Sequence, residues 1–372
     1  MIFAVVGNPE NRRVAMFQAA LAAQGLPAAR VLAWRALVTP GAPARLLGEL
    51  PGDAILRIDS MGEDDDVERA LLVRGEPAAR AEGVPAIGAR ALAKVPRELG
   101  RILHPRQAHL GFLAVLAELD AAIRPSWRVL QPAAAIAELF DKRITSKKWR
   151  RLGIPVPDAL DDVRDPDDLR ARMRDAGWPS VFVKLASGSS ASCLAVFVMR
   201  KGGEHAITTV EDTGRARYNT RRLQRVTGKP LDRLLGFLLG EGAQVERAIH
   251  KAQASGRHFD LRVLAIDGEP AFTVMRTSRH PITNLHLGGQ RGDVDALRAT
   301  VPAAAWGAAM ASCCAVQRAS GAFHVGVDLM FEPGLRAHRV IEGNAFGDLL
   351  PNLTRDGLDV YGWQIRRLLV DR

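Results

Sequence analysis

The spacing of apolar and polar residues divides the chain into two regions with different predicted secondary structure. In the first hundred residues, short apolar runs alternate with segments in which apolar residues recur at helical spacing. The apolar runs 2–6 and 54–58 predict buried strands, and segments 12–24 and 67–73 predict helices. This alternation is typical of an α/β domain, which we place at residues 1–105.

The second region has the pattern of an α+β protein with mainly antiparallel sheets. It begins with a mostly helical stretch from about 105 to 140 and two further predicted helices, at 142–152 and 161–178. We therefore expect a helical linker with a first α+β subdomain at 106–242, and a second α+β subdomain at 243–372. The strand-like runs that define these subdomains are 181–186, 193–199, 243–249, 259–266, 270–276, 323–331 and 338–345.

The strongest signal for a functional site is a predicted hairpin formed by runs 323–331 and 338–346. Both runs alternate between apolar and other residues, and a Pro-Gly pair in the connection favours a turn. If the hairpin folds about Leu335, Asp328 lies opposite Glu342, because the mean of the two numbers is 335. Their Cβ atoms are then roughly 5 Å apart.

Two interpretations of these opposed carboxylates stay open on the hairpin alone. In the first, Asp328 and Glu342 bind a cation that removes their repulsion, and Asn344, which shares the face of Glu342, adds a neutral oxygen. Hard oxygen ligands of this kind suit Mg²⁺, which completes its coordination with water and phosphate oxygens. In the second, the carboxylates lie on a solvent-facing sheet and pair with arginines.

A lysine inside an apolar strand is a second candidate feature. Lys184 lies in the run 181–186, which continues into the small-residue loop 187–192, where Ser187 and Gly188 come first. Backbone N–H groups in such a loop approach phosphate oxygens closely, and the ammonium group neutralises their charge. A flexible surface hairpin has the same pattern.

A second hairpin is predicted from 259–266 and 270–276, because Asp-Gly joins the two runs. Asp260 and Arg262 share one face of it, where the simpler interpretation is a structural ion pair. The polar, glycine-rich segment 284–289 follows, which suits a loop that approaches a ligand.

Taken in order, these motifs resemble the ATP-grasp superfamily over roughly residues 130–372. The branch that is most similar in pattern ligates amino acids to peptide or protein carboxylates. The motifs are Lys142 before a helix ending in Gly153-Ile-Pro-Val-Pro157, Lys184 before the small-residue loop, Glu246-x-x-Ile249, Asp260-x-Arg262, Asn284-Leu-His-x-Gly-Gly289, Gly326-Val-Asp328 and Glu342-x-Asn344.

The resemblance implies an α+β ATP-grasp fold, with two subdomains clasping ATP and an N-terminal α/β pre-ATP-grasp domain. It also implies Mg²⁺ as one or two ions, for which Mn²⁺ can substitute. The implied nucleotide-binding residues are Lys142, Lys184, Ser187 and Gly188 for the phosphates, Glu246 to Ile249 for the hinge against adenine, Asp260 for the ribose, and Asn284 close to the phosphates and metal. The implied metal ligands are Asp328, Glu342 and Asn344, and the catalytic residues are Arg262 and Arg276.

The chain departs from the family pattern in three places. Ile282-Thr283 stands where the ligase branch has an arginine, which leaves Arg276 or Arg279 to substitute. The phosphate loop has one glycine, Gly188, where the family usually has several. The insert Arg215–Arg225 carries five arginines and is interpreted either as a contact for an acidic substrate or, as we prefer, as a solvated helix face.

The chain carries a formal net charge of +10, and only eight of its 51 basic residues are lysines. Such a basic surface can bind nucleic acid or an acidic ligand, but a compositional bias toward Ala, Arg, Gly and Pro is the preferred explanation.

Neither GxGxxG in the first loop nor GxxxxGK[ST] occurs, which argues against a Rossmann dinucleotide site and a P-loop. Three cysteines without CxxC spacing, no leader-like N-terminus and no bilayer-length apolar run together indicate a cytoplasmic protein without a membrane partner.

The function that the resemblance implies is a carboxylate–amine ligase that forms an amide or peptide bond through an acyl-phosphate. Its partners would be a small-molecule or peptide carboxylate and an amine acceptor, and a homodimer is compatible with the sequence. The first alternative is a phosphotransferase on the same scaffold. The second is a non-catalytic protein that binds nucleic acid or a partner through its basic surface.

Overall fold

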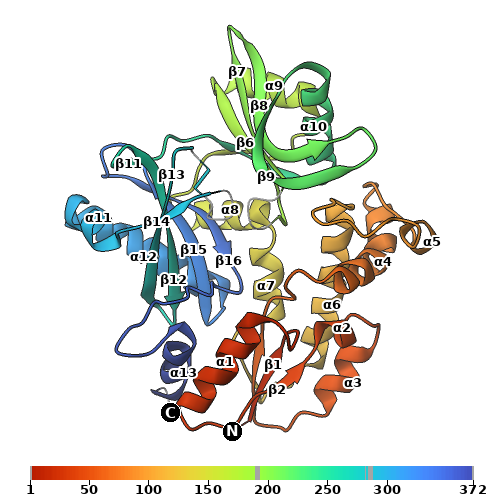
Figure 1. Cartoon of the computed structure of the whole chain (residues 1–372), viewed down its shortest axis with the longest axis vertical. Coiled ribbons are helices and arrows are strands. Elements are labelled where there is room, and N and C mark those ends of the chain that lie inside the picture. Colours follow the sequence, from red (N-terminus) through yellow and green to blue (C-terminus); the bar gives the residue numbers. More distant parts are fainter. Residues whose placement is uncertain (1, 189–192, 281, 284–287, 371–372) are drawn as a thin grey trace.

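The structure, a computed structural model of the whole chain, describes residues 2–188, 193–280, 282–283 and 288–370. Its strands form three sheets, with helices between and around them (Figure 1). No helix in this described part of the chain is long and apolar enough to cross a bilayer.

The first sheet consists of four parallel strands in the order β2-β1-β3-β4. β1 and β3 have the bounds that their apolar runs predict, and β3 is buried along its whole length. The strands are β1 (Ile2–Val6), β2 (Arg30–Leu32), β3 (Ala54–Ile58) and β4 (Arg128–Val129). The helices of this region are α1 (Arg12–Ala23), α2 (Trp34–Leu37), α3 (Ala42–Gly48), α4 (Asp65–Ala81), α5 (Ala89–Leu92) and α6 (Pro105–Ala122).

The N-terminal sheet extends beyond the boundary expected at residue 105. α6 leads the chain to β4, which lies at the edge of the sheet beside β3. α6 also packs so closely on α4 that a Cβ added at Gly75 would lie 1.9 Å from the carbonyl oxygen of Gln107. The part of the predicted helical stretch that forms α6 therefore belongs with the first sheet.

The second sheet has the order β5-β10-β6-β7-β8-β9, and all its neighbours are antiparallel. β10 pairs with β6, so that Val245 lies opposite Val183. The expected boundary at 242 is therefore wrong for β10, which completes this sheet before the chain enters the third. The elements are β5 (Ala159–Leu160), β6 (Ser180–Leu185), β7 (Leu194–Arg200), β8 (Gly203–Asp212), β9 (Arg217–Val226) and β10 (Ala243–Arg247), with α9 (Pro166–Asp175) and α10 (Gly228–Gly240).

The arginine-rich insert forms a strand, where we preferred a helix face. Most of it lies in β9, which pairs with β8 and forms the edge of the second sheet. Arg221, Arg222 and Arg225 are exposed there, as expected for a solvated surface. A strand with few apolar residues on either face shows neither helical nor strand periodicity, so pairing with β8 decided its conformation.

The third sheet has the order β14-β13-β12-β15-β16, with the short strand β11 paired to β12. α12 covers one face, where Cys313 and Val316 share a core with Val325 and Val327. Every residue of β15 is buried, so this strand has no solvent-facing side. The elements are β11 (Gln253–Ala254), β12 (Arg257–Ile266), β13 (Glu269–Ser278), β14 (Gln290–Gly292), β15 (His324–Phe331) and β16 (His338–Asn344), with α11 (Val294–Thr300) and α12 (Ala303–Ser320).

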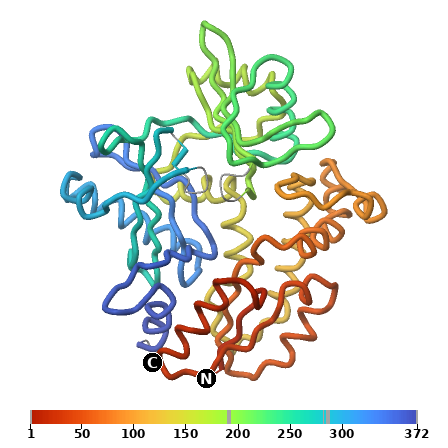
Figure 2. Tube along the Cα trace, in the orientation of Figure 1, coloured from red at the N-terminus to blue at the C-terminus, as the bar shows by residue number. Residues whose placement is uncertain are grey.

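α7 (Ala133–Leu139) and α8 (Lys142–Arg151) connect the first sheet to the second, and α13 (Val360–Val370) follows the last strand of the third. α7 and α8 lie in the middle of the molecule, between the N-terminal region and the two antiparallel sheets (Figure 1). The C-terminal helix α13 lies beside α1, where the rings of Tyr361 and Phe17 are 6.4 Å apart (Figure 2). Both ends of the described chain are thus part of the N-terminal core.

Candidate functional site

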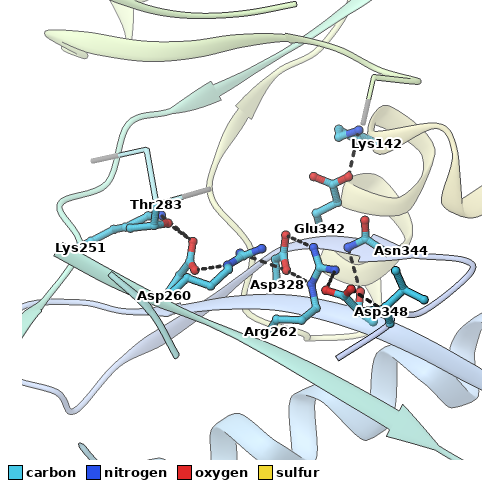
Figure 3. Close-up of polar contacts among 12 residues, drawn as sticks. Lys142, Lys251, Asp260, Arg262, Thr283, Asp328, Glu342, Asn344 and Asp348 are labelled. Carbon is cyan, nitrogen blue, oxygen red and sulfur yellow. Dashed lines mark hydrogen bonds and ion pairs between the residues drawn. The ribbon is translucent and has the colours of Figure 1, made fainter. Parts of the chain in front are cut away.

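Charged side chains from four strands of the third sheet gather on the face turned away from α12. They come from β12, β13, β15 and β16, and a lysine at the start of α8 reaches them from the side (Figure 3). The register of the strands and the charges of the neighbours determine what this group of side chains can bind.

A β-bulge places the two carboxylates of the C-terminal hairpin opposite each other. Asp328 pairs with Glu342, whereas the next pair toward the turn is Leu329 with Val340, so Ile341 is an extra residue in β16. The predicted opposition of Asp328 and Glu342 is therefore confirmed. Bulges often re-aim side chains next to active sites, and without this one Asp328 would face Ile341.

Asp328 is buried and held by two arginines. Arg262 Nε donates to Asp328 Oδ1, Arg262 Nη2 lies 3.1 Å from Oδ2, and Arg276 Nη2 lies 3.2 Å from Oδ1. Burial alone would raise the pKa of Asp328, but the charges of Arg262 and Arg276 outweigh it and hold this pKa below its ordinary value. The second interpretation, in which the carboxylates face solvent and pair with arginines, is therefore wrong about the exposure of Asp328. It is correct that Asp328 pairs with arginines.

Glu342 has a cation of its own, supplied by α8. Lys142 Nζ lies 3.2 Å from Glu342 Oε1. Gly343, between Glu342 and Asn344, allows the helices to pack this close to β16. A Cβ at this position would lie 3.0 Å from Leu139 and 3.1 Å from Trp149. The glycine between Glu342 and Asn344 thus brings α8 and its first lysine close to the hairpin.

The oxygen atoms available for a metal ion come from three residues. Asn344 Nδ2 donates to the carbonyl oxygen of Gly326 at 3.0 Å, which fixes the amide and leaves its Oδ1 free of that bond. Asp328 and Glu342 add carboxylates across the bulge. No three His, Cys, Asp or Glu side chains cluster as a metal site within the described residues, so the fit depends on two carboxylates and one amide. This hard-oxygen set suits Mg²⁺ better than a softer metal.

Asp260 is the most thoroughly bonded carboxylate of the group. It accepts from Arg276 Nε at 2.7 Å, from Lys251 Nζ at 2.9 Å and from Thr283 Oγ1. Burial opposes ionisation, but Lys251 and Arg276 outweigh it, so the pKa of Asp260 lies well below its usual range. The ion pair expected between Asp260 and Arg262 does not form, because each finds its partner on a neighbouring strand.

The two lysines expected to bind phosphates both lie near the start of the small-residue loop. Lys142 Nζ donates to the carbonyl oxygens of Ala186, at 3.4 Å, and Gly188. Lys184 Nζ lies 2.7 Å from Glu246 Oε1, so the lysine of β6 pairs with the expected hinge residue of β10. Both lysine side chains are largely buried, at 8% and 11% exposed, which is unusual for lysine.

The other predicted nucleotide-binding residues are placed only in part. Ser187 and Gly188 are half-buried at the end of β6, and Ile249 is half-buried after β10. Asn284 lies outside the described residues, as does the rest of the phosphate loop from 189 to 192. The expected contribution of these segments stays a prediction.

Two charged residues of this group were not among the expected site residues. Lys251 follows the hinge segment and reaches Asp260, and Asp348 follows β16 and accepts from Arg262 Nη1 at 2.9 Å. A sequence signal existed for Lys251, because lysine is scarce in this chain and this one follows Glu246-x-x-Ile249 closely. Asp348 lies in a segment without strand or helix periodicity, so no pattern pointed to it.

Comparisons of sequence identify no relative: no family model matches the chain, and no curated protein matches it. Solved structures do resemble it over their whole length. The ATP-grasp ligase PsnB, complexed with its minimal precursor, is 16% identical with a TM-score of 0.53, over 100% of this chain and 99% of PsnB.

Two further structures are equally similar. The macrocyclase MdnC, bound with the precursor peptide MdnA from Microcystis aeruginosa MRC, is 14% identical with a TM-score of 0.54, over 100% of both chains. The D-cycloserine synthetase DcsG is 14% identical with a TM-score of 0.53, over 99% of this chain and 100% of that one. These likenesses show the fold: the chain has the ATP-grasp fold, as its ordered motifs implied.

Proposed function

We propose that the protein is an ATP- and Mg²⁺-dependent carboxylate–amine ligase that acts through an acyl-phosphate. The observation that carries this proposal is the bulged hairpin of an ATP-grasp fold, on which the buried Asp328 faces the partly exposed Glu342 beside Asn344. Opposed carboxylates in a buried sheet destabilise it unless cations compensate them. Three protein cations, Arg262, Arg276 and Lys142, surround them here.

The metal proposed for this site is one or two Mg²⁺ ions held by Asp328, Glu342 and Asn344, and Mn²⁺ should substitute. PsnB has been solved with Mg and ADP and with AMPPNP, which supports the same cofactors for a chain of this fold. When bound, the ion supplies charge neutralisation at the transferring phosphoryl group and orients its oxygens. To hold it, Asp328 and Glu342 would exchange part of their present contacts with Arg262, Arg276 and Lys142 for metal coordination.

The nucleotide would lie between the second and third sheets. Lys142 and Lys184 provide positive charge for the phosphates where β6 leads into the loop that begins with Ser187 and Gly188. The segment from Glu246 to Ile249, which links the two sheets, would contact adenine. Asp260 already satisfies three donors, so a ribose contact there would have to displace or share one of them.

Arg262 and Arg276 are the proposed catalytic residues, because their guanidinium groups lie against Asp328 and always carry charge. Burial opposes their charge, but the carboxylates around them outweigh it and raise the pKa of both: Asp328 and Asp348 for Arg262, and Asp328 and Asp260 for Arg276. Beside a phosphoryl group they would stabilise the negative charge of the attacking carboxylate and the acyl-phosphate, mainly by fixed positioning. An amine would then attack the acyl carbon, releasing phosphate and forming the amide.

The carboxylate can belong to a peptide or to a small molecule. PsnB and MdnC are described with precursor peptides, whereas DcsG is a synthetase of D-cycloserine. This supports a choice within one chemical class, a carboxylate activated for attack by an amine.

The direct test uses hydroxylamine as the amine, because it traps an activated carboxylate without knowledge of the natural acceptor. The purified protein is incubated with ATP, Mg²⁺, hydroxylamine and pools of amino acids or acidic peptides, and products are followed by mass spectrometry. We expect ADP, phosphate and a hydroxamate in equal amounts. A phosphorylated product without phosphate release would instead identify a phosphotransferase, and ATP stable with every pool would contradict the proposal.

A further inference from the structure

A short turn after β16 brings an additional carboxylate to the site. Gly347 has a positive φ of 63°, and its N–H donates to the carbonyl oxygen of Asn344 at 3.0 Å. The turn lies directly on β15, because a Cβ added at Gly326 would be 3.1 Å from the backbone of Gly347. Arg13 of α1 donates to the carbonyl oxygen of Phe346 at 2.7 Å, which fixes the turn from the other side.

The residue that this turn presents is Asp348, and it shares an arginine with Asp328. Arg262 uses Nε and Nη2 for Asp328, while its Nη1 donates to Asp348 Oδ2 at 2.9 Å (Figure 3). Asp348 Oδ1 accepts the N–H of Leu349 at 2.7 Å, which holds the carboxylate in place. The side chain of Asp348 is 36% exposed and that of Asp328 is 12% exposed.

This sharing matters because the same oxygens of Asp328 cannot accept two arginines and coordinate a metal ion fully. Arg276 has a second carboxylate in Asp260, at 2.7 Å, and can keep it when Asp328 is taken. Arg262 would be left as a buried cation without a partner, which is strongly unfavourable, if Asp348 were not there. Each arginine therefore has one carboxylate that a metal ion would use, Asp328, and one that would stay available to the arginine.

Resting on the function proposed above, we propose that Asp348 is a positioning residue that receives Arg262 when a divalent metal ion binds at Asp328. Asp348 then determines how strongly metal and nucleotide binding reinforce each other, although it does not coordinate the metal. The guanidinium moves from a shared position to a pairing with Asp348, and no bond is made or broken. Arg262 is in turn kept where an acyl-phosphate would need it.

A thermodynamic cycle with two substitutions tests this. The affinity for AMP-PNP is measured by calorimetry with Mn²⁺ and with EDTA, and the ratio of the two affinities gives the coupling between metal and nucleotide. For Asp348→Asn we expect this ratio to fall by about tenfold, the size of one lost charge-assisted contact. The affinity in EDTA should stay within about twofold, because the substituted amide is not expected to touch the nucleotide and retains an oxygen for Leu349 N–H.

The second substitution separates a role through Arg262 from a general effect of negative charge. Arg262→Gln should raise the ratio of the AMP-PNP affinity in Mn²⁺ to that in EDTA, because Asp328 loses a cation that competes with the metal ion. In that background Asp348→Asn should change the ratio by less than about twofold, since its partner is gone. Melting temperatures verify folding, and Arg262→Met, which also lacks the charge, serves as the second background if the glutamine variant is unstable.

The outcomes distinguish this inference from the function on which it rests. A wild-type protein whose AMP-PNP affinity is the same in Mn²⁺ and EDTA contradicts the proposed function itself. If the wild-type protein binds AMP-PNP more tightly in Mn²⁺ than in EDTA and Asp348→Asn leaves this ratio unchanged, the role of Asp348 is overturned and the proposed function is not. An equal fall in both backgrounds also overturns it, because the effect would then come from long-range charge and not from Arg262.

Discussion

Two buried Arg–Asp pairs in this molecule have different surroundings. In the N-terminal region, Arg57 Nε lies 3.0 Å from Asp59 Oδ2, and the two side chains are 2% and 1% exposed. In the third sheet, Arg262 binds Asp328, and these side chains are 13% and 12% exposed. By burial alone, both look like structural ion pairs.

The neighbours separate the two pairs. Arg57 lies over the rings of Phe17 and Tyr361, with centroids 5.1 and 5.0 Å away, and donates to Gln364 at 2.6 Å. These partners are neutral and come from the helices that close the N-terminal core, so this pair joins α1, β3 and α13.

Asp328, in contrast, lies across the bulge from a second carboxylate, Glu342, and each carboxylate has a different cation. At the N-terminal pair, a further cation, Arg13 Nε, lies 3.8 Å from Asp59 Oδ1. An ion pair enclosed by two rings and an amide stabilises one structure, whereas opposed carboxylates with several cations beside a polar face can rearrange around a ligand. The predictions below test that distinction.

The largest expected effect is on turnover, at the hairpin. Glu342→Gln should lower the ligase rate by about a hundredfold to a thousandfold, because it removes a charged oxygen from the proposed metal site. The free energy of unfolding should change by less than about 1 kcal/mol, since Glu342 is partly exposed and loses one lysine contact. Rates and urea unfolding are measured together, with Glu332→Gln as the control, because Glu332 pairs with Arg339 near the turn of the same hairpin. A fully active Glu342→Gln protein would exclude this residue as a ligand.

The N-terminal pair should respond in the opposite way. Arg57→Met leaves Asp59 buried without its main cation, so the free energy of unfolding should fall by about 3 kcal/mol. Any loss of turnover should disappear when rates are corrected for the folded fraction. Denaturant unfolding measures the effect, and Arg221→Met on the exposed edge of the second sheet is the matched control, expected within about 0.5 kcal/mol of wild type. An unchanged free energy of unfolding in Arg57→Met would contradict a structural role for the Arg57–Asp59 pair.

A smaller effect is expected in the second sheet. Lys184→Met should raise the KM for ATP by about tenfold or more, because it removes one charged contact with the phosphates and leaves Glu246 unpaired. The KM for the carboxylate should change little. Lys201→Met, at an exposed turn of the same sheet, provides the control. Equal KM values for ATP in the two variants would show that Lys184 acts only on Glu246.

The smallest effect concerns acid stability. Nearby cations lower the pKa of Asp260 and Asp328 in the folded protein. Both ionised carboxylates therefore stabilise the folded protein at pH values above the ordinary aspartate pKa of 3.8. This stabilisation is lost as the pH falls from 3.8 through the lowered pKa of the folded protein. In Asp328→Asn the free energy of unfolding should therefore decline less steeply below pH 3.8. Each unit by which folding lowers the pKa of Asp328 corresponds to about 1.4 kcal/mol of stability that this carboxylate loses in acid. Unfolding at a series of acidic pH values measures the slope. A slope as steep as that of wild type would mean that Asp328 titrates alike in the folded and unfolded protein.

Much of the fold could be predicted because apolar periodicity is strong where elements are buried. The strands 2–6 and 54–58 have the predicted bounds, and the C-terminal hairpin lies within a residue or two of its expected ends. The predictions failed where pairing is decided by distant segments. β4 is two residues long, and β9 is an arginine-rich edge strand, so neither has a local hydrophobic signal.

The same contrast holds at the site. The opposition of Asp328 and Glu342 followed from hairpin geometry, because both residues lie in one local unit. The position of Asp348 depends on a turn held by α1 and β15, which lie far from it in sequence. The partners of Arg262 and Asp260 likewise come from neighbouring strands, so spacing along one strand suggested the wrong ion pair.

The most direct test of the central claim measures the affinity for AMP-PNP by calorimetry, in Mg²⁺ and in EDTA, for wild type and for Glu342→Gln. We predict that Mg²⁺ tightens binding to the wild-type protein by at least about tenfold. The variant should bind in Mg²⁺ no more tightly than in EDTA. Wild-type binding that is independent of Mg²⁺, or a variant with full Mg²⁺ dependence, would contradict a metal–nucleotide site on this hairpin.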